Sequence, residues 1–96
     1  MSGDQDFSAA VEWINTHKKE LTDLPLKQQE KLYGIYKQSQ FGDNTSSRPW
    51  ALQIIEVSKW DAWTSCKGWS QAKSKIEYIK LVNKVKIWLE EHKKPN

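Results

Sequence analysis

Apolar residues recur every three or four positions in four stretches of the chain, the spacing that places side chains on one face of an α-helix. The stretches predict helices at about 6–19, 26–41, 56–67 and 70–92. β-branched residues do not alternate with polar ones, so the pattern predicts no strand. We therefore expect one all-α domain over residues 1–96, with four helices around a shared core. The expected core residues are Phe7, Ala10, Val11, Ile14, Leu32, Ile35, Tyr36, Ser39, Trp60, Trp63, Cys66, Tyr78, Leu81, Val82, Val85, Trp88 and Leu89.

Turn-forming residues indicate where these helices begin and end. Pro25 suits the first turn of the second helix, where its missing N–H has no partner to lose. Gly42 can take the left-handed conformation that ends this helix. The stretch that follows is turn-rich and has no periodicity, which predicts a long loop. Ser58 and Asp61 resemble a capping box at the start of the third helix, and Ser70 is a good N-cap for the fourth.

Length and composition limit the kind of protein this can be. A chain of 96 residues forms one domain with a thin core, so a groove between helices is the natural place for a ligand. The single cysteine, Cys66, cannot form an intramolecular disulfide, and the first ten residues lack the features of a signal peptide. No apolar run approaches the roughly 20 residues that span a bilayer. We therefore expect a cytoplasmic protein, with a small secreted helical protein that has no disulfide bridge as the alternative.

The formal charge of +3 is unevenly distributed. Residues 1–35 carry 4 basic and 6 acidic side chains, whereas residues 68–96 carry 7 basic and 3 acidic ones. A nucleic-acid binder usually concentrates positive charge in a stripe with few acids, but here the lysines alternate with apolar residues. We interpret the surplus as the solvated face of the fourth helix and expect no nucleic-acid partner. Contact with a membrane surface or another anionic partner is the alternative.

The sequence offers little for catalysis or metal binding. His17 and His92 are far apart, and neither has a second His or Cys at the spacing of zinc ligands. Cys66 occupies a helical core position without a nearby histidine, which is typical of a buried structural thiol. There is no Gly-rich phosphate loop, GxSxG motif or pair of carboxylates in an apolar setting. We expect no enzyme, no metal centre and no cofactor.

Two tyrosines and two lysines form a more specific combination. Tyr33 and Lys37 lie one turn apart on one flank of the second helix, beside Tyr36, and Lys59 lies directly before Trp60 in the third. Paired ammonium groups with hydroxyl donors suit a phosphate, and aromatic faces suit a nucleobase. The group therefore suits a nucleotide with a phosphate on its ribose. Helix geometry alone leaves open that the tyrosines are half-buried core residues and the lysines are solvated.

Short motifs between residues 33 and 78 occur in a fixed order. They are YGIYKQ at 33–38, GDN at 42–44, RP at 48–49, KWDAW at 59–63, KG at 67–68, then Ser70 and Tyr78. In this order and register they resemble the acyl-CoA-binding protein family. The resemblance implies a four-helix bundle with up-down-down-up topology. It also implies a monomeric intracellular carrier that binds medium- and long-chain fatty acyl-CoA esters with high affinity and forms a pool of them for lipid metabolism.

The resemblance also implies roles for individual residues. The family's clamp for the 3′-phosphate of coenzyme A is matched by Tyr33, Lys37 and Lys59. Its contacts to the adenine and ribose are matched by Tyr36 and Tyr78. The ligand-contacting turn of the second helix also includes Gly34 and Ile35. The acyl tail is expected in an apolar groove lined by the first two helices and the loop between them.

Several positions depart from the family pattern. Asn15 and Ile55 stand in the expected ligand site where the family commonly has a lysine, and Lys18 or Lys19 can substitute for the first. The link between the first two helices is longer than in common members, which leaves the preferred acyl-chain length open. The tryptophans at 50, 69 and 88 stand where many relatives have smaller or polar residues. They either pack locally or form an apolar patch for a membrane surface or an acyl-CoA-using enzyme.

Overall fold

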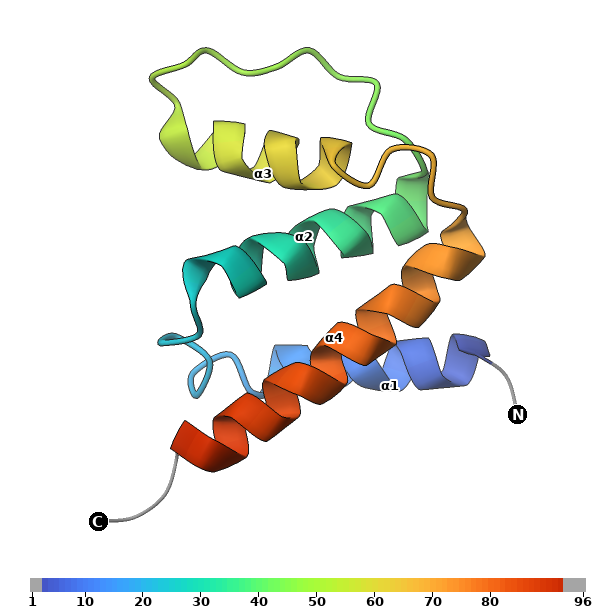
Figure 1. Cartoon of the computed structure of the whole chain (residues 1–96), viewed down its shortest axis with the longest axis vertical. Helices are drawn as coiled ribbons and strands as arrows, with labels where there is room; N and C mark the ends of the chain where they lie inside the picture. The colour runs from blue at the N-terminus through green and yellow to red at the C-terminus, as the bar shows by residue number, and fades with distance from the viewer. Residues whose placement is uncertain (1–2, 93–96) are drawn as a thin grey trace.

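The computed structural model describes residues 3–92 and contains four helices (Figure 1). They are α1 (Gly3–Thr16), α2 (Leu26–Phe41), α3 (Ile54–Thr64) and α4 (Gln71–His92). In Figure 1, α2 and α3 run side by side in one direction, and the loop 42–53 returns along them, whereas α1 and α4 run the opposite way. The expected all-α bundle with up-down-down-up topology is confirmed. Between residues 3 and 92, no helix is both long and apolar enough to cross a bilayer.

The central element is α2, because α3 and α4 both pack against it, while α1 packs on α4. The principal dimensions of the molecule are 45 × 39 × 16 Å. The shortest of these dimensions is much smaller than the other two, so the four helices form a flat arrangement. Such a thin arrangement leaves hollows on both flanks of α2 rather than enclosing a deep cavity.

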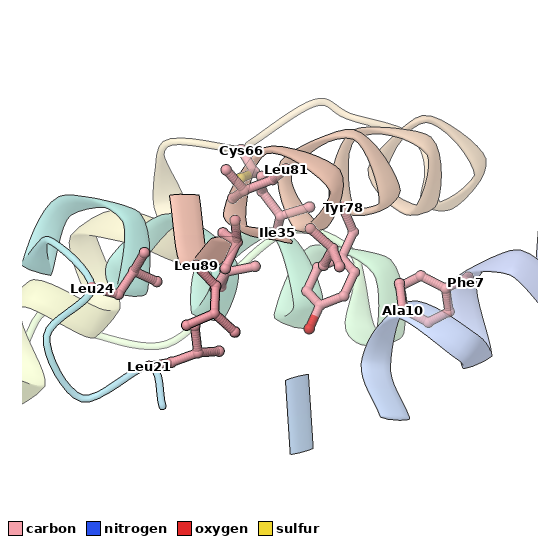
Figure 2. Packing of buried hydrophobic residues seen from close by; sticks show 12 residues of the cluster. Phe7, Ala10, Leu21, Leu24, Ile35, Cys66, Tyr78, Leu81 and Leu89 are labelled. Carbon is pink, nitrogen blue, oxygen red and sulfur yellow. The ribbon is translucent and has the colours of Figure 1, made fainter. Parts of the chain in front are cut away.

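The core forms along the line where α2 and α4 meet, with contributions from α1 and from the connections (Figure 2). Most expected core residues are buried, and Val11, Ile14, Tyr36 and Trp88 pack against them half-buried. Leu21 and Leu24, in the connection between α1 and α2, are also buried, at 7% and 3% exposure. The periodic pattern missed both because residues 17–24 form turns rather than a helix. The buried set is Phe7, Ala10, Leu21, Leu24, Leu32, Ile35, Cys66, Tyr78, Leu81, Val82, Val85 and Leu89.

The first helix ends earlier than the pattern predicted, at Thr16 rather than near Lys19. The Thr16 hydroxyl donates to the carbonyl of Trp13 at 3.1 Å, and His17 Nδ1 lies 2.8 Å from the same oxygen. The His17 amide is shared between the carbonyls of Trp13 and Ile14. Bonds of this i to i−3 kind tighten the last turn and end the helix.

At the other helix ends, the structure agrees with some of the predicted caps and differs from others. Gly42 ends α2 with a positive φ of 75° and donates its N–H to the carbonyl of Gln38, but its ψ of −154° is outside the left-handed helical region that was expected. The Ser70 hydroxyl accepts the amide of Lys73 at 2.9 Å, so this predicted N-cap is confirmed. The capping box at Ser58 is wrong, because α3 starts at Ile54 and Ser58 lies inside it. The helix also ends at Thr64, before the predicted Lys67, since residues 65–68 form a turn.

Candidate functional site

Tyr33, Lys37 and Lys59 converge where α2 packs on α3. The Nζ atoms of Lys59 and Lys37 lie 5.4 and 6.0 Å from the centre of the Tyr33 ring. Within residues 3–92, no carboxylate forms an ion pair with either lysine. Two helices thus present unpaired ammonium groups around one half-buried phenol ring, an arrangement that favours an anion with an aromatic group attached. These three residues are called the Tyr33 clamp below.

Two aromatic rings that the sequence reasoning did not assign to the site hold Lys37. Its Nζ atom lies 4.5 Å from the centre of the Phe41 ring and 4.9 Å from that of Trp63. Cation–π attraction of this kind is worth about 0.5–1 kcal/mol at an exposed site. Phe41 follows Lys37 by one helical turn, so its spacing could have indicated the contact, whereas Trp63 comes from α3 and depends on the fold.

The tryptophans of the KWDAW motif attach the loop 42–53 to α3. The indole N–H of Trp60 donates to the carbonyl of Ser46 at 3.0 Å, and that of Trp63 donates to the carbonyl of Gly42 at 2.8 Å. Each bond satisfies a loop carbonyl and fixes an indole ring. Most of the motif therefore holds the loop, while Lys59 belongs to the Tyr33 clamp and the Trp63 ring also contacts Lys37 of the clamp.

Two carboxylates complete the attachment of the loop. Asp61 accepts two hydrogen bonds from the Arg48 guanidinium, at 3.2 and 2.9 Å, in the bidentate geometry that arginine favours. Asp43 accepts the backbone N–H of Gly68 at 2.9 Å and the side-chain amide of Gln38 at 2.8 Å. These two bonds, the one from Gly68 first, lower the pKa of Asp43 below its ordinary value. Asp43 thereby joins α2 to the connection between α3 and α4.

Tyr36 of α2 and Tyr78 of α4 both pack against Phe7 of α1. The Phe7 ring is 6.3 Å from Tyr36 and 5.3 Å from Tyr78, centre to centre. Figure 2 shows Tyr78 within the core, and it is only 3% exposed. Burial, with a smaller contribution from Tyr36, raises the pKa of Tyr78 to about 12, so its phenol stays neutral near pH 7. The rings of Tyr78 and Tyr36 lie 6.2 Å apart, centre to centre, and Tyr36 is the more exposed of the two.

Asn15 and Tyr36 line the same cavity of about 450 Å³, together with Lys75 of α4. Lys75 Nζ lies 2.9 Å from Asp4 Oδ1 and 5.6 Å from the centre of the Phe7 ring. Lys75 therefore brings a positive charge to this cavity at the end formed by Asp4 and Phe7, toward the start of α1 rather than beside Asn15, and that charge is paired with Asp4. Sequence reasoning missed Lys75, although it precedes Tyr78 by three residues and so shares its helix face.

A smaller cavity of about 270 Å³ lies where the acyl tail was expected. It is lined by residues of α1, α2 and the turns between them: Ile14, Lys18, Leu21, Thr22, Leu24, Gln29 and Leu32. Lys18 therefore lines this cavity rather than the one that contains Asn15. Lys19 lines another hollow, beside Trp88 and His92. Neither lysine takes the place expected for it.

Comparison with known proteins then decides the family. Residues 4–82 match the family model described as acyl CoA binding protein. The chain belongs to the acyl-CoA-binding protein family. It is 39% identical over 85 residues to acyl-CoA-binding protein homolog 3 of Caenorhabditis elegans, covering 86% of this chain and 72% of that one. It is 39% identical over 82 residues to acyl-CoA-binding domain-containing protein 6 of Arabidopsis thaliana, covering 84% and 85%. Its fold is similar to the crystal structure of Oryza sativa acyl-CoA-binding protein 2, with a TM-score of 0.85, 25% identity and coverage of 97% and 100%.

Gly34 and Ile35, which the family resemblance placed in the ligand-contacting turn, both lie in packed surroundings. A Cβ atom on Gly34 would lie 2.4 Å from the carbonyl oxygen of Ala62, so α2 and α3 are in close contact at Gly34. Ile35 is buried and lines a groove on the other flank of α2. The structure therefore gives both residues a packing role. Ile55 lies one turn before Lys59 on α3 and is 67% exposed.

The three tryptophans at the positions expected to depart from the family pattern differ in their surroundings. Trp69 is half-buried with Lys73 Nζ 4.8 Å from its ring centre, and Trp88 is half-buried and stacked on His92. Both pack locally. Trp50 is instead 68% exposed, and three more apolar side chains near it in sequence, at positions 52, 54 and 55, are 67–72% exposed. Trp50, Leu52, Ile54 and Ile55 are called the apolar rim below.

Proposed function

We propose that this protein is an intracellular carrier that binds medium- and long-chain acyl-CoA and holds the coenzyme A 3′-phosphate in the Tyr33 clamp. Binding of acyl-CoA follows from membership of the family. The observation that supports the clamp is the convergence of Lys37 and Lys59, from two helices, on the Tyr33 ring. Tyr36 and Lys75, which line the adjacent cavity, are placed to meet the rest of the nucleotide.

The two halves of the ligand contribute differently to binding. Burying one CH₂ group is worth about 0.8 kcal/mol, so a 16-carbon tail could contribute on the order of 10 kcal/mol before the cost of ordering it. The clamp supplies anchoring and recognition of the head. Long-chain acyl-CoA is therefore expected to bind tightly, free coenzyme A weakly, and free fatty acid more weakly still at this site.

Calorimetry of clamp variants tests the assignment. Lys37→Ala and Lys59→Ala each remove a charged hydrogen-bond donor and should weaken palmitoyl-CoA binding by more than about 1.5 kcal/mol, or roughly tenfold. Lys86→Ala is a matched control, because Lys86 lies on α4 over the ring of Trp13, away from the clamp. Circular dichroism checks that all three variants are folded. Parent-like affinity in both clamp variants would refute the assignment.

We propose binding without turnover. Cys66 is 3% exposed, and burial raises the pKa of its thiol, which makes it a poor nucleophile. Within residues 3–92, no three His, Cys, Asp or Glu side chains are grouped to hold a metal. Incubating the protein with palmitoyl-CoA should release no free thiol above the buffer rate, and steady release would contradict this proposal.

The apolar rim supports a further part of the proposal, that the carrier collects acyl-CoA at a membrane surface. Its four exposed apolar side chains include Ile55, one turn from Lys59, so an acyl-CoA leaving a bilayer meets the rim beside the clamp. Trp50→Ser with Ile54→Ser should slow loading from anionic vesicles but leave affinity in free solution within about twofold. Ile76→Ser with Ile87→Ser, two exposed positions on α4, is the matched control. Unchanged loading by the rim variant would exclude this role.

The proposed location is the cytoplasm, where the free thiol of Cys66 would stay reduced. The proposed active form is the monomer, since one chain provides all three residues of the Tyr33 clamp. Cell fractionation and analytical ultracentrifugation test these two statements separately.

A further inference from the structure

A groove of about 860 Å³, larger than the two cavities on the α1 side, lies between α2, α3 and α4. It occupies the opposite flank of α2 from the Tyr33 clamp. Lys27, Lys31 and Ile35 line it and follow one another at intervals of four residues, whereas Tyr33 and Lys37 point about half a turn away. A volume of this size is within the range of about 300–1,000 Å³ that small-molecule sites occupy.

The floor of the groove is apolar. Ile35, Leu81 and Cys66 lie close together in Figure 2, and Ala62 and Trp69 extend the same surface. These side chains come from α2, from α4 and from the end of α3 with the turn behind it. An alkyl chain laid along them would be removed from water at about 0.8 kcal/mol per CH₂.

The rim of the groove has a surplus of unpaired positive charge. Its titratable side chains are Lys27, Glu30, Lys31, Asp61, Glu77, Lys80 and Lys84. Arg48 pairs with Asp61 at 2.9 Å, and Lys80 lies 3.6 Å from Glu77, so these two carboxylates are already compensated. Within the described part of the chain, the other three lysines have no ion pair, and Glu30 is the single unpaired acid that faces them.

Helix direction separates this charge from most of the apolar floor. Lys27 and Lys31 lie in the first turns of α2, and because α4 runs antiparallel to α2, Lys84 lies toward the same end of the groove. Cys66 and Trp69 follow α3, which runs parallel to α2, so they lie toward the other end. The unpaired lysines of the groove therefore lie toward one end, and much of its apolar floor, together with the paired Glu77 and Lys80, lies toward the other.

We propose that this groove is a second lipid site that binds a single-chain amphiphile with an anionic head, such as a free fatty acid. The head lies among Lys27, Lys31 and Lys84, and the chain runs over Ile35 and Leu81 toward Trp69. The site operates while acyl-CoA occupies the Tyr33 clamp, since the two lie on opposite flanks of α2. A carboxylate and a phosphate monoester share the required chemistry.

Nuclear magnetic resonance can test the site on the acyl-CoA-loaded protein. Sodium dodecanoate, added below its micelle concentration to protein saturated with palmitoyl-CoA, should shift the amide resonances of Ala62 and Cys66 and the indole resonance of Trp69. If the site recognises the anionic charge, dodecyl phosphate should produce the same shifts. If the site selects carboxylates, only dodecanoate should produce them. Dodecyltrimethylammonium, with the same chain and opposite charge, should not produce these shifts.

Charge reversal gives the matched variants. Lys31→Glu with Lys84→Glu should weaken dodecanoate binding by at least about tenfold while leaving palmitoyl-CoA affinity within about twofold. Lys86→Glu with Lys19→Glu makes the same change of net charge outside the lining residues of the groove, and should leave both affinities near those of the parent.

Three results would overturn the proposal. Dodecanoate that only displaces palmitoyl-CoA would place it at the clamp rather than in the groove. If dodecyltrimethylammonium bound as tightly as dodecanoate, the lysines would not contribute to recognition of the head group. Resonances of Ala62 and Trp69 that shift with protein concentration alone would show that a second copy of the chain covers the groove. Each of these results would leave palmitoyl-CoA binding at the clamp intact, so failure of the groove proposal can be told apart from failure of the proposed acyl-CoA-binding function.

Discussion

Gly34 gives the sharpest test of the packing, because its substitution by alanine should act against the usual preference of a helix. Gly34 lies in the middle of α2, where alanine is ordinarily the better residue by about 1 kcal/mol. Here the new Cβ would lie 2.4 Å from the carbonyl oxygen of Ala62, 2.5 Å from its carbonyl carbon and 2.9 Å from the amide nitrogen of Trp63. All three atoms belong to the backbone of α3, so no side chain can rotate away.

The magnitude follows from these two opposing effects. Overpacking typically costs about 1–3 kcal/mol, and contact with backbone favours the upper end of that range because a whole helix has to move. Subtracting the propensity gain of about 1 kcal/mol leaves a net loss of about 2 kcal/mol for Gly34→Ala. For a domain of this size that corresponds to a fall of roughly 8–16 °C in Tm. Displacement of α3 would also move Lys59, so acyl-CoA affinity should fall together with stability.

Urea denaturation followed by circular dichroism, with calorimetry of palmitoyl-CoA binding, measures both effects. Gly3→Ala is the control, since a Cβ on Gly3 meets nothing within 4 Å and the residue lies in the first turn of α1. That variant should be neutral or slightly stabilised. If Gly34→Ala were as stable as the parent, the close approach of α2 and α3 at this residue would be refuted.

Three ionisable groups give further predictions. The pKa of Tyr78 is raised to about 12 in the fold and is near 10 in the unfolded chain, so its contribution to stability is complete below about pH 10 and falls as the pH rises toward 12. In urea titrations at about pH 11, the free energy of unfolding of the parent should therefore fall by about 1.4 kcal/mol more than that of Tyr78→Phe. Equal losses in the two proteins would contradict the buried position of this phenol. Because the pKa of Asp43 is lowered in the fold, the ionised carboxylate stabilises the fold at neutral pH, and this contribution is lost as the pH falls through that pKa. Asp43→Asn should therefore be less stable than the parent at about pH 7 and approach the stability of the parent near pH 2. A difference in stability that does not change with pH would argue against the assigned hydrogen bonds. Burial raises the pKa of Cys66, so a thiol reagent should modify it only as the protein unfolds in urea, and rapid labelling of the native protein would disagree with its position.

Local signals carried most of what could be predicted from the sequence. The helix-period pattern gave the four helices, and Gly42 and Ser70 gave two ends correctly, because caps depend on residues within one turn of each other. The start of α3 was wrong because Ser58 and Asp61 carry the capping pattern but lie inside the helix, after a start at Ile54 that no side chain caps. A pattern of residue types does not show which of two neighbouring turns begins the helix.

Residues whose role depends on distant parts of the chain were not predictable in this way. Gln38 is fully buried, yet its surroundings come from Asp43 and from the carbonyl of Trp69, 31 positions away. Lys75 reaches the cavity beside Asn15 only because α4 crosses α1. Leu21 and Leu24 are buried although they lie in turns. In each case the cause is a contact between elements, which periodicity within one helix does not contain.

The positions of these residues on α2 also link the two proposed binding sites. Gly34 lies between the flank that bears Tyr33 and the flank that bears Ile35, so the contact with Ala62 sets the distance of α3 from both. Moving α3 should therefore weaken the clamp and the groove together, whereas reversing the charge of Lys31 and Lys84 should weaken the groove alone. Comparing Gly34→Ala with that double variant, on palmitoyl-CoA and on dodecanoate, separates the scaffold from the sites. A groove that kept its affinity when α3 moved would not be formed by α3.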